Sequence, residues 1–223
     1  MKRSELVPGP VRKIGIKNFS IRGNMPEGPE YESSLERDFM ELTRFDRNIK
    51  LYTAQPLIVD YVDAEGKARV YYPDAFIEYR RDIYPAREMP HVLCEIKYRS
   101  NFRQQWRELL PKFRAAKQFA TERGWEFKVF TEKEIRTPYL KNVKFLWAYR
   151  ERPRNAGIAD LVLLHLSELR ETDPEALMCS LFRDRWKRAE ALPDLWYLIA
   201  NHQVGCDLSE PLTMQTTIWT LEG

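Results

Sequence analysis

The sequence has few of the residues that build disulfide frameworks and histidine-based sites. Its 223 residues include only three cysteines and three histidines, and Cys94, Cys179 and Cys206 lack the spacing of metal-binding motifs. We therefore expect free thiols in a reducing compartment, without a zinc site or a histidine-based nucleophilic triad. No apolar run approaches the roughly 18 residues of a membrane span, and the basic N-terminus lacks the apolar segment of a secretory signal. These absences predict a cytoplasmic protein without a membrane partner.

The charged residues are unevenly distributed along the chain. The net charge is only +3. Residues 1–156 hold 31 Lys/Arg and 22 Asp/Glu, a net +9, whereas residues 157–223 hold 5 and 11, a net −6. A polyanion would attract the first part and repel the second. The asymmetry indicates two units with different partners.

The first 152 residues have the patterns of an α/β protein. Residues 1–30 predict an irregular basic arm. A helix is expected over residues 31–48, capped by Ser33 or Ser34. Segments 51–63 and 68–80 flank the turn-like "AEGK" and predict an antiparallel hairpin. Further strands are expected at 91–99 and 125–131, separated by a helix in which Pro111 forces a kink or a restart. Residues 31–152 then form a mixed β-sheet with helices on its faces.

The last third of the chain has a different pattern. The stretch "RERPRNAG", residues 150–157, suits a linker. Helical patterns follow at 157–170, 174–183 and 185–201, and alternating short strand segments come last. Residues 153–223 therefore predict a small winged-helix-like domain.

Three charged side chains interrupt the apolar strand patterns. Asp74 follows a proline in "YYPDAFIEY", and Glu95 and Lys97 alternate in "CEIKYR". Alone, each has an ordinary explanation as turn chemistry or as a solvated pair. Together they would form a costly buried carboxylate pair, unless a cation such as Mg²⁺ and a nearby ammonium compensate it. Glu36 lies in the first helix, at the margin of its apolar face, and could supply a third carboxylate. This set fits metal-dependent phosphodiester hydrolysis.

These motifs, with "SLERDF" before them and "FATERGWEFKVFTEKEIRTPYLKNVKFL" after them, resemble the restriction-endonuclease-like PD-(D/E)XK nucleases. More narrowly, the chain resembles the TnsA family of transposon-end endonucleases over residues 30–150, and more loosely up to residue 219. The resemblance implies catalytic roles for Glu36, Asp74, Glu95 and Lys97. It implies metal binding, of Mg²⁺ or substituting Mn²⁺, at Glu36, Asp74, Glu95 and Ile96. Some family members carry Gln at the position of Glu95, which is the stronger metal ligand.

The resemblance also implies a setting for this activity. A TnsA-like subunit cuts the 5′ ends of a transposon in double-stranded DNA, while a TnsB-like transposase cuts and joins the 3′ ends. A TnsC-like AAA+ regulator contacts the C-terminal part. The expected location is the bacterial cytoplasm, with association to the nucleoid during transposition.

Several alternatives remain open from the sequence. The chain could be a stand-alone restriction-type or junction-resolving nuclease of the same fold, or a DNA-bound adaptor without chemistry. The acidic C-terminal domain favours a protein contact, although the basic strip "RDRWKR" could still meet DNA. Trp106, Trp125 and Trp147 have the spacing of core aromatics rather than of a base-stacking platform. Gln55 is either a structural residue at a strand edge, which we favour, or a group that supports the site or contacts DNA.

Overall fold

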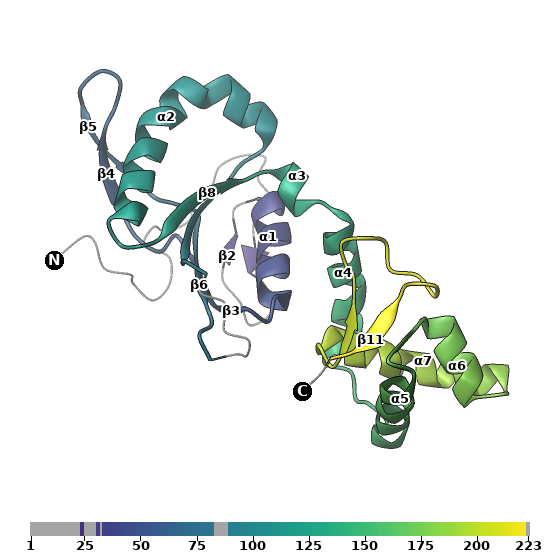
Figure 1. Ribbon diagram of the computed structural model, residues 1–223. Helices are drawn as coiled ribbons and strands as arrows, with labels where there is room; N and C mark the ends of the chain where they lie inside the picture. Colours follow the sequence, from purple (N-terminus) through teal and green to yellow (C-terminus); the bar gives the residue numbers. More distant parts are fainter. Residues whose placement is uncertain (1–22, 25–29, 32, 83–88, 222–223) are drawn as a thin grey trace. The chain divides into compact units, whose positions relative to one another are not determined.

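A computed structural model describes residues 23–24, 30–31, 33–82 and 89–221. The chain divides into two compact units, residues 1–135 and 136–223 (Figure 1). The expected N-terminal arm lies outside the described residues, except for the short antiparallel strands β1 (Gly23–Asn24) and β2 (Glu30–Tyr31).

A four-stranded mixed sheet forms the centre of the first unit. Its strand order is β3 (Ile49–Ala54), β6 (Ala75–Tyr79), β7 (Val92–Ile96) and β8 (Glu126–Phe130). The first three strands are antiparallel to one another, and β8 runs parallel to β7. All five residues of β7 are buried. A strand buried on both faces needs a helical layer on each side.

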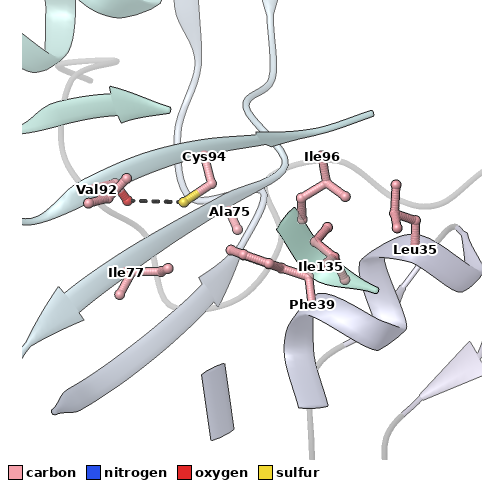
Figure 2. Packing of buried hydrophobic residues seen from close by; sticks show 8 residues of the cluster. All are labelled: Leu35, Phe39, Ala75, Ile77, Val92, Cys94, Ile96 and Ile135. Atoms are coloured by element: carbon pink, nitrogen blue, oxygen red, sulfur yellow. Dashed lines mark hydrogen bonds between the residues drawn. The ribbon is translucent and has the colours of Figure 1, made fainter. Parts of the chain in front are cut away.

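Helices cover both faces of this sheet. On one face, α1 (Ser34–Phe45) and the short α3 (Glu132–Ile135) enclose an apolar cluster (Figure 2). That cluster takes the alternate residues Ala75 and Ile77 of β6 and Val92, Cys94 and Ile96 of β7. On the other face, α2 (Arg99–Thr121) packs over Phe76 and Leu93. Because strand side chains alternate between faces, Asp74 and Glu95 belong to the α2 side.

The helix limits follow the sequence signals closely. Ser33 is the N-cap of α1, and its hydroxyl accepts a hydrogen bond from the Glu36 backbone N–H. Helix α2 continues through Pro111, so the predicted restart there does not occur, and its ribbon bends along its length (Figure 1). Gly124 follows α2 with φ +69°, a conformation that glycine adopts at little cost.

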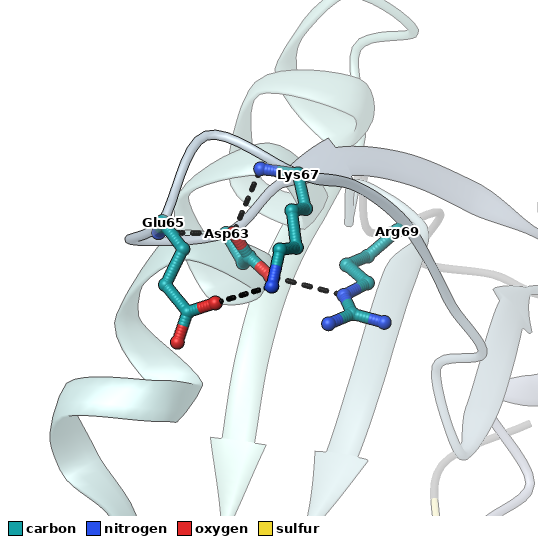
Figure 3. Close-up of polar contacts among 4 residues, drawn as sticks. All are labelled: Asp63, Glu65, Lys67 and Arg69. Carbon is teal, nitrogen blue, oxygen red and sulfur yellow. Dashed lines mark hydrogen bonds and ion pairs between the residues drawn. The ribbon is translucent and has the colours of Figure 1, made fainter.

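The single hairpin expected over residues 51–80 is divided between two sheets. The outer parts pair as β3 and β6, whereas β4 (Val59–Val62) and β5 (Ala68–Tyr71) form a separate two-stranded ribbon. The break falls at Gln55–Pro56 on one side and Pro73–Asp74 on the other, since proline cannot donate to a ladder. At the ribbon tip, Asp63 accepts hydrogen bonds from the Glu65 and Lys67 backbones and from the Arg69 guanidinium (Figure 3).

The second unit is mainly helical. It contains α4 (Pro138–Arg150), α5 (Ala156–Leu169), α6 (Pro174–Leu181) and α7 (Arg185–Ala200). A three-stranded antiparallel sheet has the order β10 (Val204–Cys206), β11 (Ile218–Thr220) and β9 (Glu171–Thr172). The helical character expected for the C-terminal region is confirmed, while the winged-helix-like domain stays a prediction; the strand β9 lies between α5 and α6.

Helix α4 belongs to the second unit, although the sequence places the linker after it, at residues 150–157. The Phe145 ring packs against the Trp196 ring of α7 at 5.5 Å. The buried Asn142 amide donates to the carbonyls of Leu208 and Glu210 and accepts from the Leu212 N–H. These contacts bind α4 to the C-terminal segment and place the division of the chain after Ile135.

Candidate active site

The charged residues singled out in the sequence meet at one pocket of the first unit. The pocket has a volume of about 420 Å³ and opens between α1, the β4–β5 ribbon, β7 and α2. Its lining includes Glu36, Asp74, Glu95, Ile96 and Lys97. The pocket thus brings together Glu36 and Lys97, which are 61 positions apart in the sequence.

Asp74 is positioned by the pairing of β6 with β7. Ala75 pairs with Cys94 in the antiparallel register, so the next residues outward, Asp74 and Glu95, lie opposite each other. The Asp74 Oδ2 atom accepts a hydrogen bond of 2.7 Å from the Ile96 backbone N–H. Burial raises the pKa of Asp74 well above its ordinary value, and the charges of Glu95 and Glu36 raise it further. The carboxylates of Asp74 and Glu95 therefore repel each other when both are ionised.

Glu95 is held on both of its oxygen atoms. It is only 2% exposed. Its Oε1 atom accepts a hydrogen bond of 2.9 Å from the Lys97 ammonium, and its Oε2 atom accepts one from the Tyr71 hydroxyl. A carboxylate has about four lone-pair sites, so these two donors leave room for further ligands. The two hydrogen bonds fix the orientation of the side chain within the pocket.

Lys97 keeps its proton despite its partial burial. Burial lowers the pKa of its ammonium, but the charges and hydrogen bond of Glu95, together with Asp74 and Glu36, outweigh that effect and raise the pKa above 10.5. Lys97 therefore presents a positive charge to the pocket at neutral pH.

Glu36 enters the pocket from the first turn of α1. Its carboxylate accepts a hydrogen bond of 2.9 Å from the Ser33 hydroxyl, whose oxygen in turn caps the helix by accepting from the Glu36 backbone N–H. The same cap that begins the helix thus orients the third carboxylate. Glu36 lies near enough to Asp74 to raise the pKa of that carboxyl group.

The structure adds two residues to this site that the sequence reasoning missed. Tyr71 of β5 supplies the hydroxyl that holds Glu95. Lys112 of α2 lines the pocket with its ammonium 5.7 Å from the centre of the Tyr71 ring. Burial, as the largest cause, lowers the pKa of Lys112. Tyr71 opens the quoted motif "YYPDAFIEY", but nothing in the motif marks this residue as a partner of Glu95, and Lys112 lies outside the quoted motifs. Both residues reach the pocket through tertiary packing.

Gln55 supports the site through its backbone. It adopts a positive φ of 45° at the end of β3, and its N–H donates a hydrogen bond of 2.8 Å to the Asp74 carbonyl. This bond continues the β3–β6 ladder to the residue that carries the pocket carboxylate. The Gln55 backbone therefore has a structural role, because it holds the main chain at Asp74.

The mixed sheet, with α1 on one face and α2 on the other, is the core expected for a restriction-endonuclease-like fold. The chain belongs to the TnsA family of endonucleases. Residues 46–132 match the family model of the TnsA-like endonuclease N-terminal domain, and residues 134–208 match that of the TnsA endonuclease C-terminal domain. No curated protein matches the chain significantly.

The two family models meet close to the structural division after Ile135. The N-terminal model includes Asp74, Glu95 and Lys97 but begins after Glu36. Membership makes the chain a DNA endonuclease of the Tn7 transposition type. In the described part of the chain, no helix is long and apolar enough to cross a bilayer.

Proposed function

We propose that this protein hydrolyses one DNA strand at each end of a transposon, using Mg²⁺ bound at the pocket of the first unit. The observation that carries the proposal is the convergence of Glu36, Asp74, Glu95 and Lys97 on one pocket in a member of the TnsA family. Mn²⁺ is expected to substitute for Mg²⁺.

The donor atoms of the pocket fit a hard divalent cation. They are carboxylate oxygens, which Mg²⁺ prefers. Burial, and after it repulsion by Glu95 and Glu36, raises the pKa of Asp74, and a bound cation would offset both effects. Among the described residues, no three His, Cys, Asp or Glu side chains are close enough to form a metal cluster. We therefore assign the cation first to Asp74 and Glu95 with the main chain at Ile96, and place Glu36 as a third carboxylate in the lining of the same pocket.

The residues of the pocket divide the chemistry among them. A cation bound there supplies Lewis-acid activation of water and phosphate. Lys97, as an ammonium, stabilises negative charge on the scissile phosphate. Tyr71 and Lys97 hold the Glu95 carboxylate in place, and the Ile96 N–H does the same for Asp74.

The remainder of the proposal concerns the assembly. Family membership supports a subunit of a heteromeric transposase that cuts the 5′ ends, beside a TnsB-like transposase and a TnsC-like AAA+ regulator. The second unit as a whole is nearly neutral, with 11 Lys/Arg and 12 Asp/Glu over residues 136–223, and its acidic part is residues 157–223, with a net charge of −6. We therefore assign the protein contact with the regulator to residues 157–223. The protein would act in the bacterial cytoplasm, on the nucleoid.

Strand-resolved mapping of cuts on a labelled transposon end tests this function. The full-length protein is compared with Asp74→Ala, each with and without the co-expressed transposase. We expect metal-dependent cuts at the 5′ ends only with the wild-type protein, and assembly of the complex with both. Wild-type cutting by Asp74→Ala, or full activity in excess EDTA, would refute the assignment. Sequence-specific cutting by the pure protein without a partner would favour a stand-alone nuclease of the same fold.

The role of the C-terminal unit has its own test. Removal of residues 157–223 should weaken co-purification of the AAA+ partner more than binding to bare DNA. A greater loss of DNA binding would reverse the argument from charge and assign the basic strip at residues 183–188 to DNA.

A further inference from the structure

The first half of α2 stands exposed beside the pocket. Nine successive residues, 100–108, are all exposed, although the preceding strand β7 is buried along its whole length. The next residue, Leu109, is only 2% exposed. All faces of these two and a half turns are thus exposed in the described chain, and the Phe102 ring stacks on the Phe113 ring of the same helix at 6.2 Å. Exposed faces of this kind are available to another molecule.

Arginine residues form a row along this half-helix. Arg99, Arg103 and Arg107 are spaced by four positions, which places them on one helix face about 6 Å apart along the axis. We call these three residues the arginine row. Arg103 and Arg107 are exposed, and Glu108 is the one acidic residue of the segment 99–108. The first turn of α2 holds no acidic residue, so the positive end of the helix dipole adds to the same field.

The neighbouring side chains are also suited to nucleic acid. Trp106, which the sequence predicts to be a core residue, is 47% exposed, and Phe102 is 39% exposed. The Arg107 guanidinium lies 5.7 Å from the centre of the Trp106 ring. In the sequence, the amides Gln104 and Gln105 come between Phe102 and Trp106. Arginine, amide and aromatic side chains are the groups that contact phosphate, sugar and bases.

The position of the half-helix connects it to the pocket. Helix α2 begins two residues after Lys97, and Asn101 and Lys112 of α2 both line the pocket. Asn101 lies between Arg99 and Arg103, and Lys112 follows Arg107 by five residues. A duplex that brings a phosphate to Lys97 therefore passes the exposed half of α2.

We propose that the arginine row docks the backbone of duplex DNA next to the scissile phosphate. This inference rests on the proposed function, because it takes DNA as the substrate of the pocket. The cationic row favours a polyanion over an apolar partner surface. The N-terminal residues 1–22, with six Lys/Arg and one Glu, would be repelled by it.

Salt-dependent binding of the full-length protein to a fluorescent duplex, in EDTA to prevent cleavage, tests the inference. The probe is a duplex that carries the transposon end sequence. Arg103→Gln/Arg107→Gln removes two phosphate contacts and keeps good helix formers. The negative slope of log K against log salt should become less steep, by about two units. Between about 50 and 200 mM salt, the wild type should therefore lose roughly tenfold more affinity than the variant.

Two variants separate charge from fold. Lys117→Gln/Lys128→Gln removes the same charge from exposed positions outside the segment, and its slope should equal that of the wild type. Arg103→Lys/Arg107→Lys keeps the charge, so its slope of log K against log salt should lie close to that of the wild type. The circular dichroism spectrum of each variant should equal that of the wild type.

An unchanged slope for Arg103→Gln/Arg107→Gln would overturn the docking surface while leaving the proposed function intact. Absence of duplex binding by the wild type at low salt would overturn it as well, whereas the cleavage assay with Asp74→Ala would still decide the proposed function. An equal loss of salt dependence in Lys117→Gln/Lys128→Gln would show a general charge effect and would also refute docking at the arginine row. Loss of partner protein binding, with DNA binding unchanged, would reassign the row to a protein contact.

Discussion

The Tyr71 hydroxyl donates a hydrogen bond to the Oε2 atom of Glu95, and this bond joins the β4–β5 ribbon to the central strand β7. The pocket therefore depends on a residue that lies outside the four-stranded sheet. Burial raises the pKa of Tyr71 well above its ordinary value, and Glu95 raises it further. Tyr71 is thus a neutral donor at all physiological pH values, and we infer that it positions Glu95.

Tyr71→Phe tests this positioning role. The ring remains, but the Glu95 carboxylate loses one of its two donors. We expect a decrease in cleavage of about 10- to 100-fold, as is typical for residues that orient a metal ligand. The Mg²⁺ concentration at half-maximal rate should rise in parallel, which a loss of packing alone would not cause. An unchanged Mg²⁺ dependence would show that Tyr71 only fills space.

Asp74→Asn should separate stability from activity. The folded-state pKa of Asp74 is raised above its ordinary 3.8, so its contribution to stability is present below that value and is lost as the pH rises through the folded-state pKa. Asparagine resembles the protonated form and can still accept from the Ile96 N–H. We expect the variant to lose cleavage but to unfold at a higher temperature than the wild type at neutral pH in EDTA.

At Asp82, replacement of the carboxylate by an amide should change the unfolding temperature in the opposite direction. Its hydrogen bond to Arg80 lowers the pKa of that carboxyl group to about 2. Asp82→Asn should therefore lower the unfolding temperature slightly at neutral pH, since the pair is exposed and screened. Equal shifts for Asp74→Asn and Asp82→Asn in a thermal melt would argue against repulsion within the pocket.

Two glycines of the second unit give a matched pair of substitutions. A Cβ atom at Gly205 would lie 2.3 Å from the Trp219 ring, its cross-strand neighbour, whereas one at Gly157 meets only the Asn155 side chain at 3.5 Å. Gly205→Ala should destabilise the unit by about 1–3 kcal/mol. Gly157→Ala, near the start of α5, should stabilise it by up to about 0.5–1 kcal/mol. Urea unfolding measures both, and equal signs would contradict the packing at Trp219.

The three cysteines should differ in reactivity. Cys94 is fully buried, and burial raises the pKa of the Cys206 thiol to about 12, so neither presents a thiolate near pH 8. Cys179 is exposed. We expect a maleimide to label the folded protein once, and Cys179→Ser to abolish the labelling. Rapid labelling of two or more thiols under native conditions would contradict the burial of Cys94 or the raised thiol pKa of the partly buried Cys206.

Local signals made much of this fold readable from the sequence. The Ser33 cap and the apolar runs of β6 and β7 depend on residues within a few positions of one another, so the sequence predicts these elements well. The division of the 51–80 hairpin was not, because it depends on which strand pairs with which once Pro56 and Pro73 interrupt the ladders. Helix α4 was assigned to the first unit because its contact with α7 lies more than 40 residues away in the chain.

The site shows the same distinction. Proline followed by Asp74, and Glu95 alternating with Lys97, are patterns within single strands, and they predicted which residues would share a pocket. Tyr71 and Lys112 carry no such pattern, because their role depends on how the ribbon and α2 fold over β7. The exposure of Trp106 was also hidden, since the spacing of aromatic residues cannot tell a packed helix face from a bare one.

The separation of the β4–β5 ribbon from the main sheet has a consequence for protein engineering. Because β3 and β6 pair independently of β4 and β5, the turn that Asp63 organises (Figure 3) can be lengthened or exchanged without altering the spacing of the pocket carboxylates. Tyr71 lies at the opposite end of the ribbon, paired with Val59, so new residues grafted at the tip would leave it undisturbed. The tip thus offers a place to append a recognition loop beside an intact nuclease core.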